Sequence, residues 1–250
     1  MNRILVLLGA GAALACGQTA QEIMQEVQKR SESDSQHYEG TLKVIDAKNK
    51  ITEKKWIYNR MGAHGQSKAV LKFVAPPEVK GVALLILNHP DRASDQWMWT
   101  PAISRERRIA LQDRSTRFFG TDFSFEDLEE RDVDQYSYQI LASEPIDSVA
   151  CWKLQSTPKR DRSSQYSHSY VWVRKADYVI ARVEGYKNEK LLRTITYSDI
   201  ANVQNLWTAR KLEVLDAGRN SRTVLTLEKL QYNVPQKDED FTLQALRRQS

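Results

Sequence analysis

The sequence has few of the residues that build metal, disulfide or catalytic sites. Its 250 residues include two cysteines and four histidines. No two histidines are placed at the spacing of metal ligands; they are His37, His64, His89 and His168. The sequence also has no C-x-x-C pair, no phosphate-binding glycine loop and no G-x-S-x-G elbow. We therefore expect no metal, no cofactor and no catalytic residue, which favours a binding protein over an enzyme.

Long apolar runs are also scarce. The one near the start, "MNRILVLLGAGAALA", has Arg3 followed by the uncharged residues 4–15. This stretch is too short to span a bilayer and ends in small residues, which is typical of a secretory signal peptide. We expect residues 1–15 to be removed on export. Cys16 follows directly and is a candidate for lipidation, which would anchor the protein in a membrane.

Charge of one sign is not concentrated in the chain. The formal net charge is +5, and its densest spots are Arg105–Arg108 and Lys159–Arg162. A nucleic-acid-binding protein needs a basic face with a reading element, so no nucleic acid is expected as a partner. Arg105, Arg107 and Arg108 are candidates for contact with a lipid headgroup or an acidic partner, and a solvated strand edge is the alternative.

The sequence does contain a long series of strand patterns. Residues 19–29 have the pattern of a helix, in which Thr19 and Glu22 have the spacing of a capping box. About a dozen short alternating or β-branched runs follow, joined by polar turns. The run "VALLIL" suits a strand that is buried on both faces, and residues 238–247 suit a short helix. These patterns predict a single domain over residues 19–250, built on one strongly curved antiparallel sheet.

Four of the six phenylalanines lie in one stretch, "RFFGTDFSFEDL" at residues 117–128. Ser124 and Asp127 predict the start of a short helix here. Trp97 and Trp99 are two residues apart, so in a strand they share one face. The aromatic stretch is interpreted either as a plug that closes one end of the sheet or as a lid over an apolar cavity. In the second interpretation the cavity is lined by members of one set: Trp97, Trp99, Phe118, Phe119, Phe123, Phe125 and Leu128.

Three motifs in this order resemble the outer-membrane lipoprotein-sorting protein family of the LolA-like superfamily. They are Val79-Lys80-Gly81, the segment from Asp95 to Ile109, and the segment from Gly120 to Leu128. The resemblance implies a mainly β fold, in which a curved antiparallel sheet forms an unclosed β-barrel and short helices cover its concave side. It also implies a cavity for acyl chains and no catalytic residue.

The resemblance further implies a role in the periplasm of a bacterium with two membranes. Such a carrier binds the acyl chains of lipoproteins or other lipids and transfers them toward the outer membrane, in this branch with an RND-type membrane transporter. One alternative is a periplasmic sensor domain that detects lipids or mislocalised lipoproteins. A second alternative is an exported hydrolase that uses Asp122, Glu126 or Asp127, although neighbouring carboxylates at a helix start are usually caps.

Overall fold

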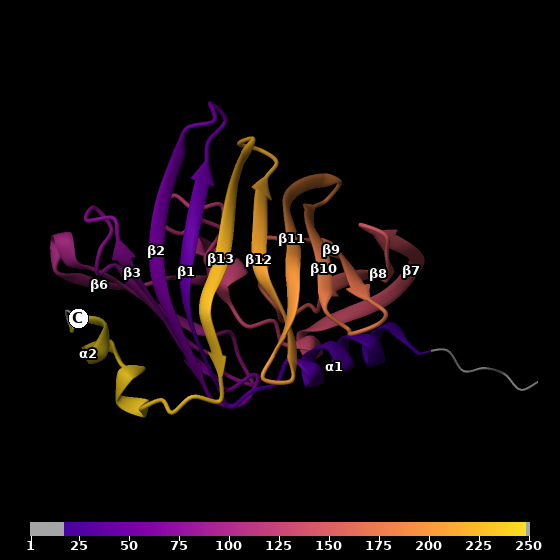
Figure 1. The fold of residues 1–250 in the computed structure, drawn as a ribbon, viewed down its shortest axis with the longest axis horizontal. Coiled ribbons are helices and arrows are strands. Elements are labelled where there is room, and N and C mark those ends of the chain that lie inside the picture. The colour runs from indigo at the N-terminus through magenta and orange to yellow at the C-terminus, as the bar shows by residue number, and fades with distance from the viewer. Residues whose placement is uncertain (1–17, 249–250) are drawn as a thin grey trace, which may run out of the picture.

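The computed structural model describes residues 18–248, so the expected signal peptide (residues 1–15) and Cys16 lie outside the described residues. Within the described part, 13 strands form one antiparallel sheet that does not close into a barrel (Figure 1). In chain order the strands are β1 Ser35–Ile45, β2 Ile51–Met61, β3 Lys68–Ala75, β4 Ala83–Leu87, β5 Asp95–Thr100, β6 Arg105–Arg108, β7 Tyr136–Ile146, β8 Val149–Pro158, β9 His168–Arg174, β10 Ile180–Lys187, β11 Lys190–Val203, β12 Leu206–Asp216 and β13 Ser221–Tyr232. This confirms the predicted fold class.

The order of the strands explains how one face of the sheet is covered. The chain builds the sheet from its middle to one edge as β1 to β6, and then continues at the opposite edge with β7. From there β7 to β13 return to the middle, where β13 pairs with β1. Residues 109–135, here called the crossover segment, must therefore run from one edge of the sheet to the other. The face that this segment covers is called the inner face.

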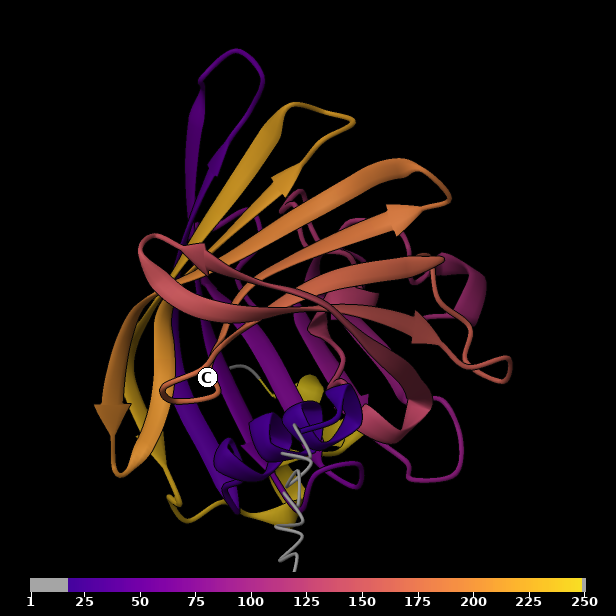
Figure 2. The same cartoon turned by 90° about the vertical axis from the view of Figure 1, so that its right-hand side faces the viewer.

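The helix α1 (Ala20–Arg30) covers the inner face of the second half of the sheet. Its capping box is present, since Thr19 accepts a hydrogen bond from the Glu22 amide and the Glu22 carboxylate accepts one from the Thr19 amide. Ile23 and Met24 are buried against Leu154 of β8 and against β9. Figures 1 and 2 show α1 at the lower end of the curved sheet, below β10 and β11. The predicted amphipathic helix is thus a cover for an apolar surface.

The C-terminal segment covers the outer face of the first half. In place of one helix over residues 238–247, the chain makes a 3₁₀ turn at Asp238–Asp240 and the short helix α2 (Leu243–Leu246). Phe241 and Leu246 pack on Ala83 and Leu85 of β4. Because the crossover segment covers the other face of β4, this strand is buried on both sides, as its continuous apolar sequence predicts.

The family motif around Gly81 has a steric cause. Gly81 has a φ of +80°, and a Cβ there would lie 3.0 Å from the Pro101 ring. Its amide donates to the carbonyl of Phe73 at 2.8 Å. A glycine is therefore needed for the chain to turn into β4 beneath Pro101.

Candidate functional site

The crossover segment is fixed to the middle of the sheet through a buried carboxylate. Asp122 is 0% exposed. It accepts hydrogen bonds from the hydroxyls of Ser221 (2.5 Å) and Thr223 (2.7 Å) on β13, and from Arg117 at 2.6 Å. Arg193 of β11 donates to the Asp122 carbonyl at 2.9 Å. Since the carboxylate, the amide and the carbonyl of the buried Asp122 all have partners, the segment is held at a defined place on the sheet.

A second carboxylate joins the two halves of the molecule. Glu129 accepts hydrogen bonds from Arg114 at 2.5 Å and from Arg162 at 3.0 Å. Gln96 of β5 donates to the same carboxylate at 2.9 Å. Burial raises the pKa of Glu129, and the two guanidinium groups oppose that rise. The crossover segment is thus tied both to the β5 side and to the loop between β8 and β9.

Between these two attachment points, the aromatic residues of the crossover segment pack on the inner face of β2 and β3. The ring of Phe118 stacks on Phe73 with centroids 5.4 Å apart and lies 5.5 Å from Phe125 in an edge contact. Trp56 of β2 lies 5.8 Å from Phe73 and 6.2 Å from Phe123. Aromatic packing of this kind stabilises a core beyond the area that it buries. Phe118, Phe119 and Phe125 thus form a plug against Phe73.

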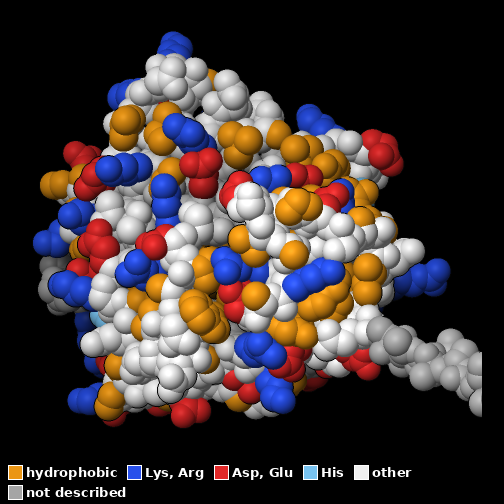
Figure 3. Space-filling view, turned by 45° about the vertical axis from the view of Figure 1, so that its right-hand side comes forward, with side chains coloured by type: hydrophobic (Ala, Val, Ile, Leu, Met, Phe, Trp, Pro, Cys, Tyr) orange, Lys and Arg blue, Asp and Glu red, His pale blue; other side chains and the backbone are white. Residues whose placement is uncertain are grey.

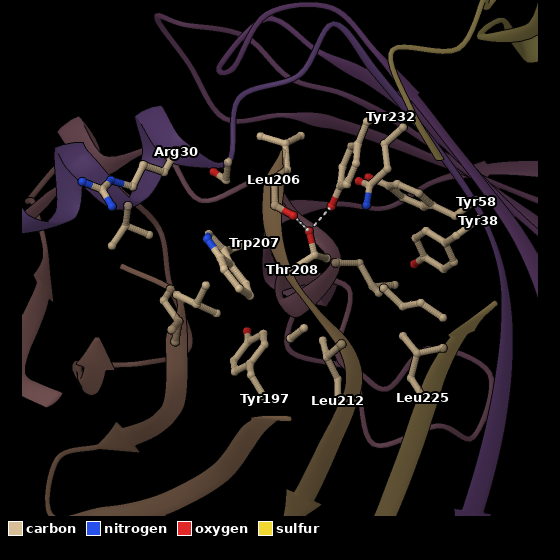
Figure 4. Close-up of a pocket in the computed structure, with 18 of the residues that line it drawn as sticks. Arg30, Tyr38, Tyr58, Tyr197, Leu206, Trp207, Thr208, Leu212, Leu225 and Tyr232 are labelled. Atoms are coloured by element: carbon tan, nitrogen blue, oxygen red, sulfur yellow. Dashed lines mark hydrogen bonds between the residues drawn. The ribbon is translucent and has the colours of Figure 1, made fainter. Parts of the chain in front are cut away.

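Below the plug the inner face is hollow. A cavity of about 760 Å³ lies between the middle strands, the crossover segment and α1. Volumes of this size are typical of small-molecule sites. Its walls are mainly apolar, and the apolar lining includes Val27, Trp56, Leu71, Ile86, Phe123, Leu128, Leu206, Trp207, Leu212, Leu225 and Leu227. Figure 4 shows several of these side chains pointing into the space from β12 and β13.

Five tyrosines contribute polar atoms to the cavity wall, together with charged residues that include Arg30 and Asp127. Tyr38 and Tyr58 stack with centroids 4.8 Å apart, and the Tyr232 hydroxyl hydrogen-bonds Thr208 at 2.8 Å (Figure 4). Burial raises the pKa of Tyr58 and of Tyr197 to about 12. These phenols are neutral at physiological pH, so the tyrosines themselves add hydrogen-bonding groups to the wall without adding charge.

The mouth of the cavity lies between α1 and the turn that joins β11 to β12. Trp207 follows this turn and remains 49% exposed. Arg30, in the last turn of α1, lies over the ring of Tyr178 at 4.2 Å. Trp207 and Arg30 both line the cavity (Figure 4). An amphipathic indole and a cationic side chain thus flank the opening.

The predicted aromatic residues divide between the plug and the cavity. Phe123 and Leu128 line the cavity. Phe118 is 0% exposed and packs with Phe125 in the plug, and Phe119 lies against Phe118 and Phe73. Plug residues and cavity-lining residues are therefore interleaved along the same segment. The helix expected after Ser124 is one 3₁₀ turn, Glu126–Leu128, with the predicted reciprocal hydrogen bonds between Ser124 and Asp127.

The expectation that Trp97 and Trp99 line the cavity needs correction. They share one face of β5, as their spacing predicts, but it is the outer face. There they pack with Leu85, Phe241 and the helix α2. Alternation shows that two residues share a face without showing which face it is. The sequence of β5 alone could not predict which face is covered, because the C-terminal segment that covers these tryptophans lies far along the chain.

The three arginines form part of the edge strand β6. Arg107 pairs with Asp113 at 2.6 Å, and Arg108 pairs with Asp95 and lies 5.9 Å from the Trp97 ring. Arg105 is exposed. They lie away from the lining of the cavity, and their contact with a headgroup or partner stays a prediction. Figure 3 shows a face of the molecule on which basic, acidic and apolar side chains are interspersed.

The carboxylates of the aromatic stretch are occupied by structural hydrogen bonds. Glu126 accepts from Ser164 and from the amide of Gln165, and Asp127 accepts from Ser124 and from the Tyr166 hydroxyl at 2.7 Å. Residues 18–248 contain no cluster of three or more His, Cys, Asp or Glu side chains that could hold a metal. Within residues 18–248, no helix is both long enough and apolar enough to cross a membrane.

Several cavity residues were not singled out by sequence reasoning. Tyr38, Tyr58 and Tyr197 come from strands with no distinctive motif. One signal was Gly40, where a Cβ would lie 2.2 Å from Nε1 of Trp56. A glycine inside a strand marks the close approach of another group. In this protein it allows the Trp56 indole to approach β1 closely, and Trp56 lines the cavity.

Comparison with known structures gives the class of the protein. A domain described as an outer membrane lipoprotein-sorting protein from Vibrio parahaemolyticus is similar, with a TM-score of 0.86, 26% identity, and coverage of 92% of this chain and 98% of that one. A DUF1329 family protein from Desulfovibrio piger has a TM-score of 0.86 at 24% identity, with coverage of 91% and 97%. A LolA superfamily protein from Nitrosomonas europaea has a TM-score of 0.72 at 21% identity, with coverage of 92% and 100%. The fold is that of LolA-like lipoprotein-sorting proteins.

The family follows from a direct match. A family model that carries only the description "-like: Uncharacterized protein" matches residues 65–248, and the chain belongs to that family. The three motifs that predicted the resemblance lie within this range, and the resemblance is confirmed. No curated protein matches the chain.

Proposed function

We propose that the protein is an exported, periplasmic carrier that binds the acyl chains of lipoproteins or other lipids in the inner-face cavity. The observation that carries this proposal is the mainly apolar cavity of about 760 Å³, which Phe123 and Leu128 of the crossover segment help to line. Each methylene moved from water into such a space contributes about 0.8 kcal/mol. A chain of about 15 methylenes would therefore contribute on the order of 10 kcal/mol before ordering costs.

The similarity to a lipoprotein-sorting domain supports the same proposal. Transfer toward the outer membrane and cooperation with an RND-type transporter are finer parts of it, and they rest on the family resemblance. Binding without catalysis fits the engagement of Glu126 and Asp127 in structural hydrogen bonds.

Export is the remaining part of the proposal, and it rests on the sequence of residues 1–16. The intact mass of the mature protein tests it. A chain that starts near Cys16 without added mass fits a shuttle across an aqueous space. A diacylglyceryl increment on Cys16 would fix the protein to a membrane and contradict the shuttle.

The binding experiment uses a fluorescent fatty acid and a variant that fills the cavity. Ala209 of β12 is buried and lines the cavity. We expect Ala209→Phe to weaken binding of the probe at least tenfold, while the protein stays folded. Ala150→Phe, at an exposed position of β8, is the matched control. Equal binding by wild type and Ala209→Phe would place the probe elsewhere, and native mass spectrometry of protein from its own cells would identify the natural ligand.

A further inference from the structure

A second, polar chamber opens beside the apolar cavity. Its volume is about 320 Å³. The chamber and the cavity have six lining residues in common, Ser31, Gln36, Tyr58, Ile86, Leu128 and Tyr232. The two spaces therefore adjoin along these residues, which is the arrangement that an elongated molecule with one end in each would need.

The far wall of the chamber carries a carboxylate with one engaged oxygen and one open oxygen. Oε2 of Glu130 accepts hydrogen bonds from the Gly65 amide at 2.9 Å and from the Ser67 hydroxyl at 2.8 Å. Oε1 lies 3.8 Å from Nη1 of Arg60 and 3.9 Å from Nε2 of His64. Both distances exceed the range of a direct hydrogen bond. A hydroxyl placed between Oε1 and His64 could bond to both.

The single arginine of the chamber wall is already used by the protein. Nη1 of Arg60 donates to the Gly62 carbonyl at 2.8 Å, and Nη2 donates to the carbonyl (2.7 Å) and hydroxyl (2.8 Å) of Ser33. These bonds hold the chain before β1 against the turn after β2. Both Nη atoms of Arg60 are therefore engaged, and the guanidinium is poorly placed to bind a phosphate through two parallel hydrogen bonds.

The charge of the lining also disfavours an anion. Three carboxylates line the chamber, those of Glu32, Glu129 and Glu130. Glu129 is compensated by Arg114 and Arg162, which leaves Arg60 facing the other two. Lys29 and Arg30 lie at the wall of the main cavity and are not part of the chamber lining. A phosphate in the chamber would therefore lie next to negatively charged carboxylates that repel it. A hydroxyl or polyol could donate its hydrogen bonds to the same carboxylates.

We propose that this chamber binds the uncharged, hydroxyl-bearing end of an amphiphile whose hydrocarbon part occupies the main cavity. Glu130 Oε1 accepts from the hydroxyl, and His64 supplies the second contact. Tyr58, which lines both spaces, stands at the junction of chain and headgroup. The inference rests on the proposed function, because it takes for granted that the cavity holds a hydrocarbon chain.

The test compares ligands that share one acyl chain. Displacement of a fluorescent fatty acid is measured with 1-palmitoylglycerol, with 1-palmitoyl lysophosphatidic acid, with methyl palmitate and with free glycerol. For the wild type we expect 1-palmitoylglycerol to bind about tenfold more tightly than the phosphate-bearing ligand. An equal or tighter affinity for lysophosphatidic acid would overturn the proposal, and so would binding of free glycerol without any gain from the chain.

Two variants test the residues. Glu130→Gln keeps an oxygen for Gly65 and Ser67 but places an NH₂ group at the Oε1 position, so a ligand hydroxyl loses its acceptor. We expect it to weaken binding of 1-palmitoylglycerol about tenfold and to leave methyl palmitate unchanged. His64→Ala should act in the same direction. Glu53→Gln, at an exposed position of β2, is the control.

The results separate the two proposals. If methyl palmitate and the fluorescent probe bind but neither variant changes the preference for 1-palmitoylglycerol, the headgroup chamber is wrong and the carrier function stands. If no acyl ligand binds the wild type, the carrier function is wrong and the chamber falls with it. Unfolding in urea, measured for both variants, shows whether a loss of binding comes from a loss of fold.

Discussion

Asp122 and Thr223 form a reciprocal pair that joins the crossover segment to β13. The Thr223 hydroxyl donates to the Asp122 carboxylate at 2.7 Å, and the Asp122 amide donates to the same hydroxyl at 2.8 Å. Both residues are fully buried. Since β13 pairs with β1 in the middle of the sheet, this pair fixes the crossover segment at the centre of the inner face.

The first prediction concerns the strength of this attachment. Asp122→Ala leaves Arg117 without its carboxylate and leaves two hydroxyls on β13 without an acceptor. We expect the free energy of unfolding to fall by about 3 kcal/mol, because breaking a buried charged pair strands its partner. Ser221→Ala removes one hydrogen bond of the same group and should cost about 1 kcal/mol. Denaturant unfolding measures both, and equal losses would show that the carboxylate is not the centre of the attachment.

The second prediction separates the plug from the cavity. Phe118→Leu and Phe123→Leu make the same change at two buried positions, of which only Phe123 lines the cavity. We expect each to lower the free energy of unfolding by about 1–3 kcal/mol. Affinity for a fatty-acid probe, corrected for the folded fraction, should change by about threefold or more for Phe123→Leu alone. A similar change in affinity for Phe118→Leu would extend the binding site into the plug.

Local patterns in the sequence predicted the elements well because their causes are local. The capping box at Thr19 and Glu22 involves residues three apart, and the doubly buried sequence of β4 reflects burial along a single strand. The aromatic density of residues 117–128 is also a local signal, and it predicted a segment that packs on the sheet. The alternation of apolar residues and the positions of turn residues are also local signals, and they predicted the curved antiparallel sheet.

The cavity was harder to predict because its walls come from distant segments. Trp97 and Trp99 were assigned to the cavity, and the covering of their face by Phe241 is set by residues far along the chain. Tyr58 and Tyr197 line the same cavity although they belong to different halves of the sheet. The position of α1, which completes the cavity wall, depends on tertiary packing that no strand pattern records.

The third prediction concerns alkaline pH. Burial raises the pKa of Tyr58 and Tyr197 from the ordinary value of 10 to about 12. In the unfolded chain these phenols lose their protons near pH 10, while in the folded protein they keep them. The stability that they contribute is therefore fully present below pH 10 and is lost as the pH rises toward 12.

Urea unfolding at a series of pH values checks this direction, and the absorbance of phenolate reports the titration itself. Tyr58→Phe removes one of the tyrosines whose pKa burial raises, a set that also includes Tyr186 at about 12, and should make the decline between pH 10 and 12 less steep. A decline of the same steepness in Tyr58→Phe would assign the alkaline loss of stability to other groups.

The fourth prediction uses two tryptophans on opposite faces of the sheet. Trp207 lines the mouth of the cavity and is 49% exposed, so a hydrocarbon chain entering there should remove water from its indole. We expect palmitate to shift the tryptophan emission of the wild type to shorter wavelength. Trp207→Phe should lose most of this shift. Trp97→Phe is the matched control, because Trp97 packs on the outer face with α2, and it should keep the shift. If Trp97→Phe loses the shift and Trp207→Phe keeps it, the hydrocarbon chain binds beneath the C-terminal segment and the inner-face cavity is not the binding site.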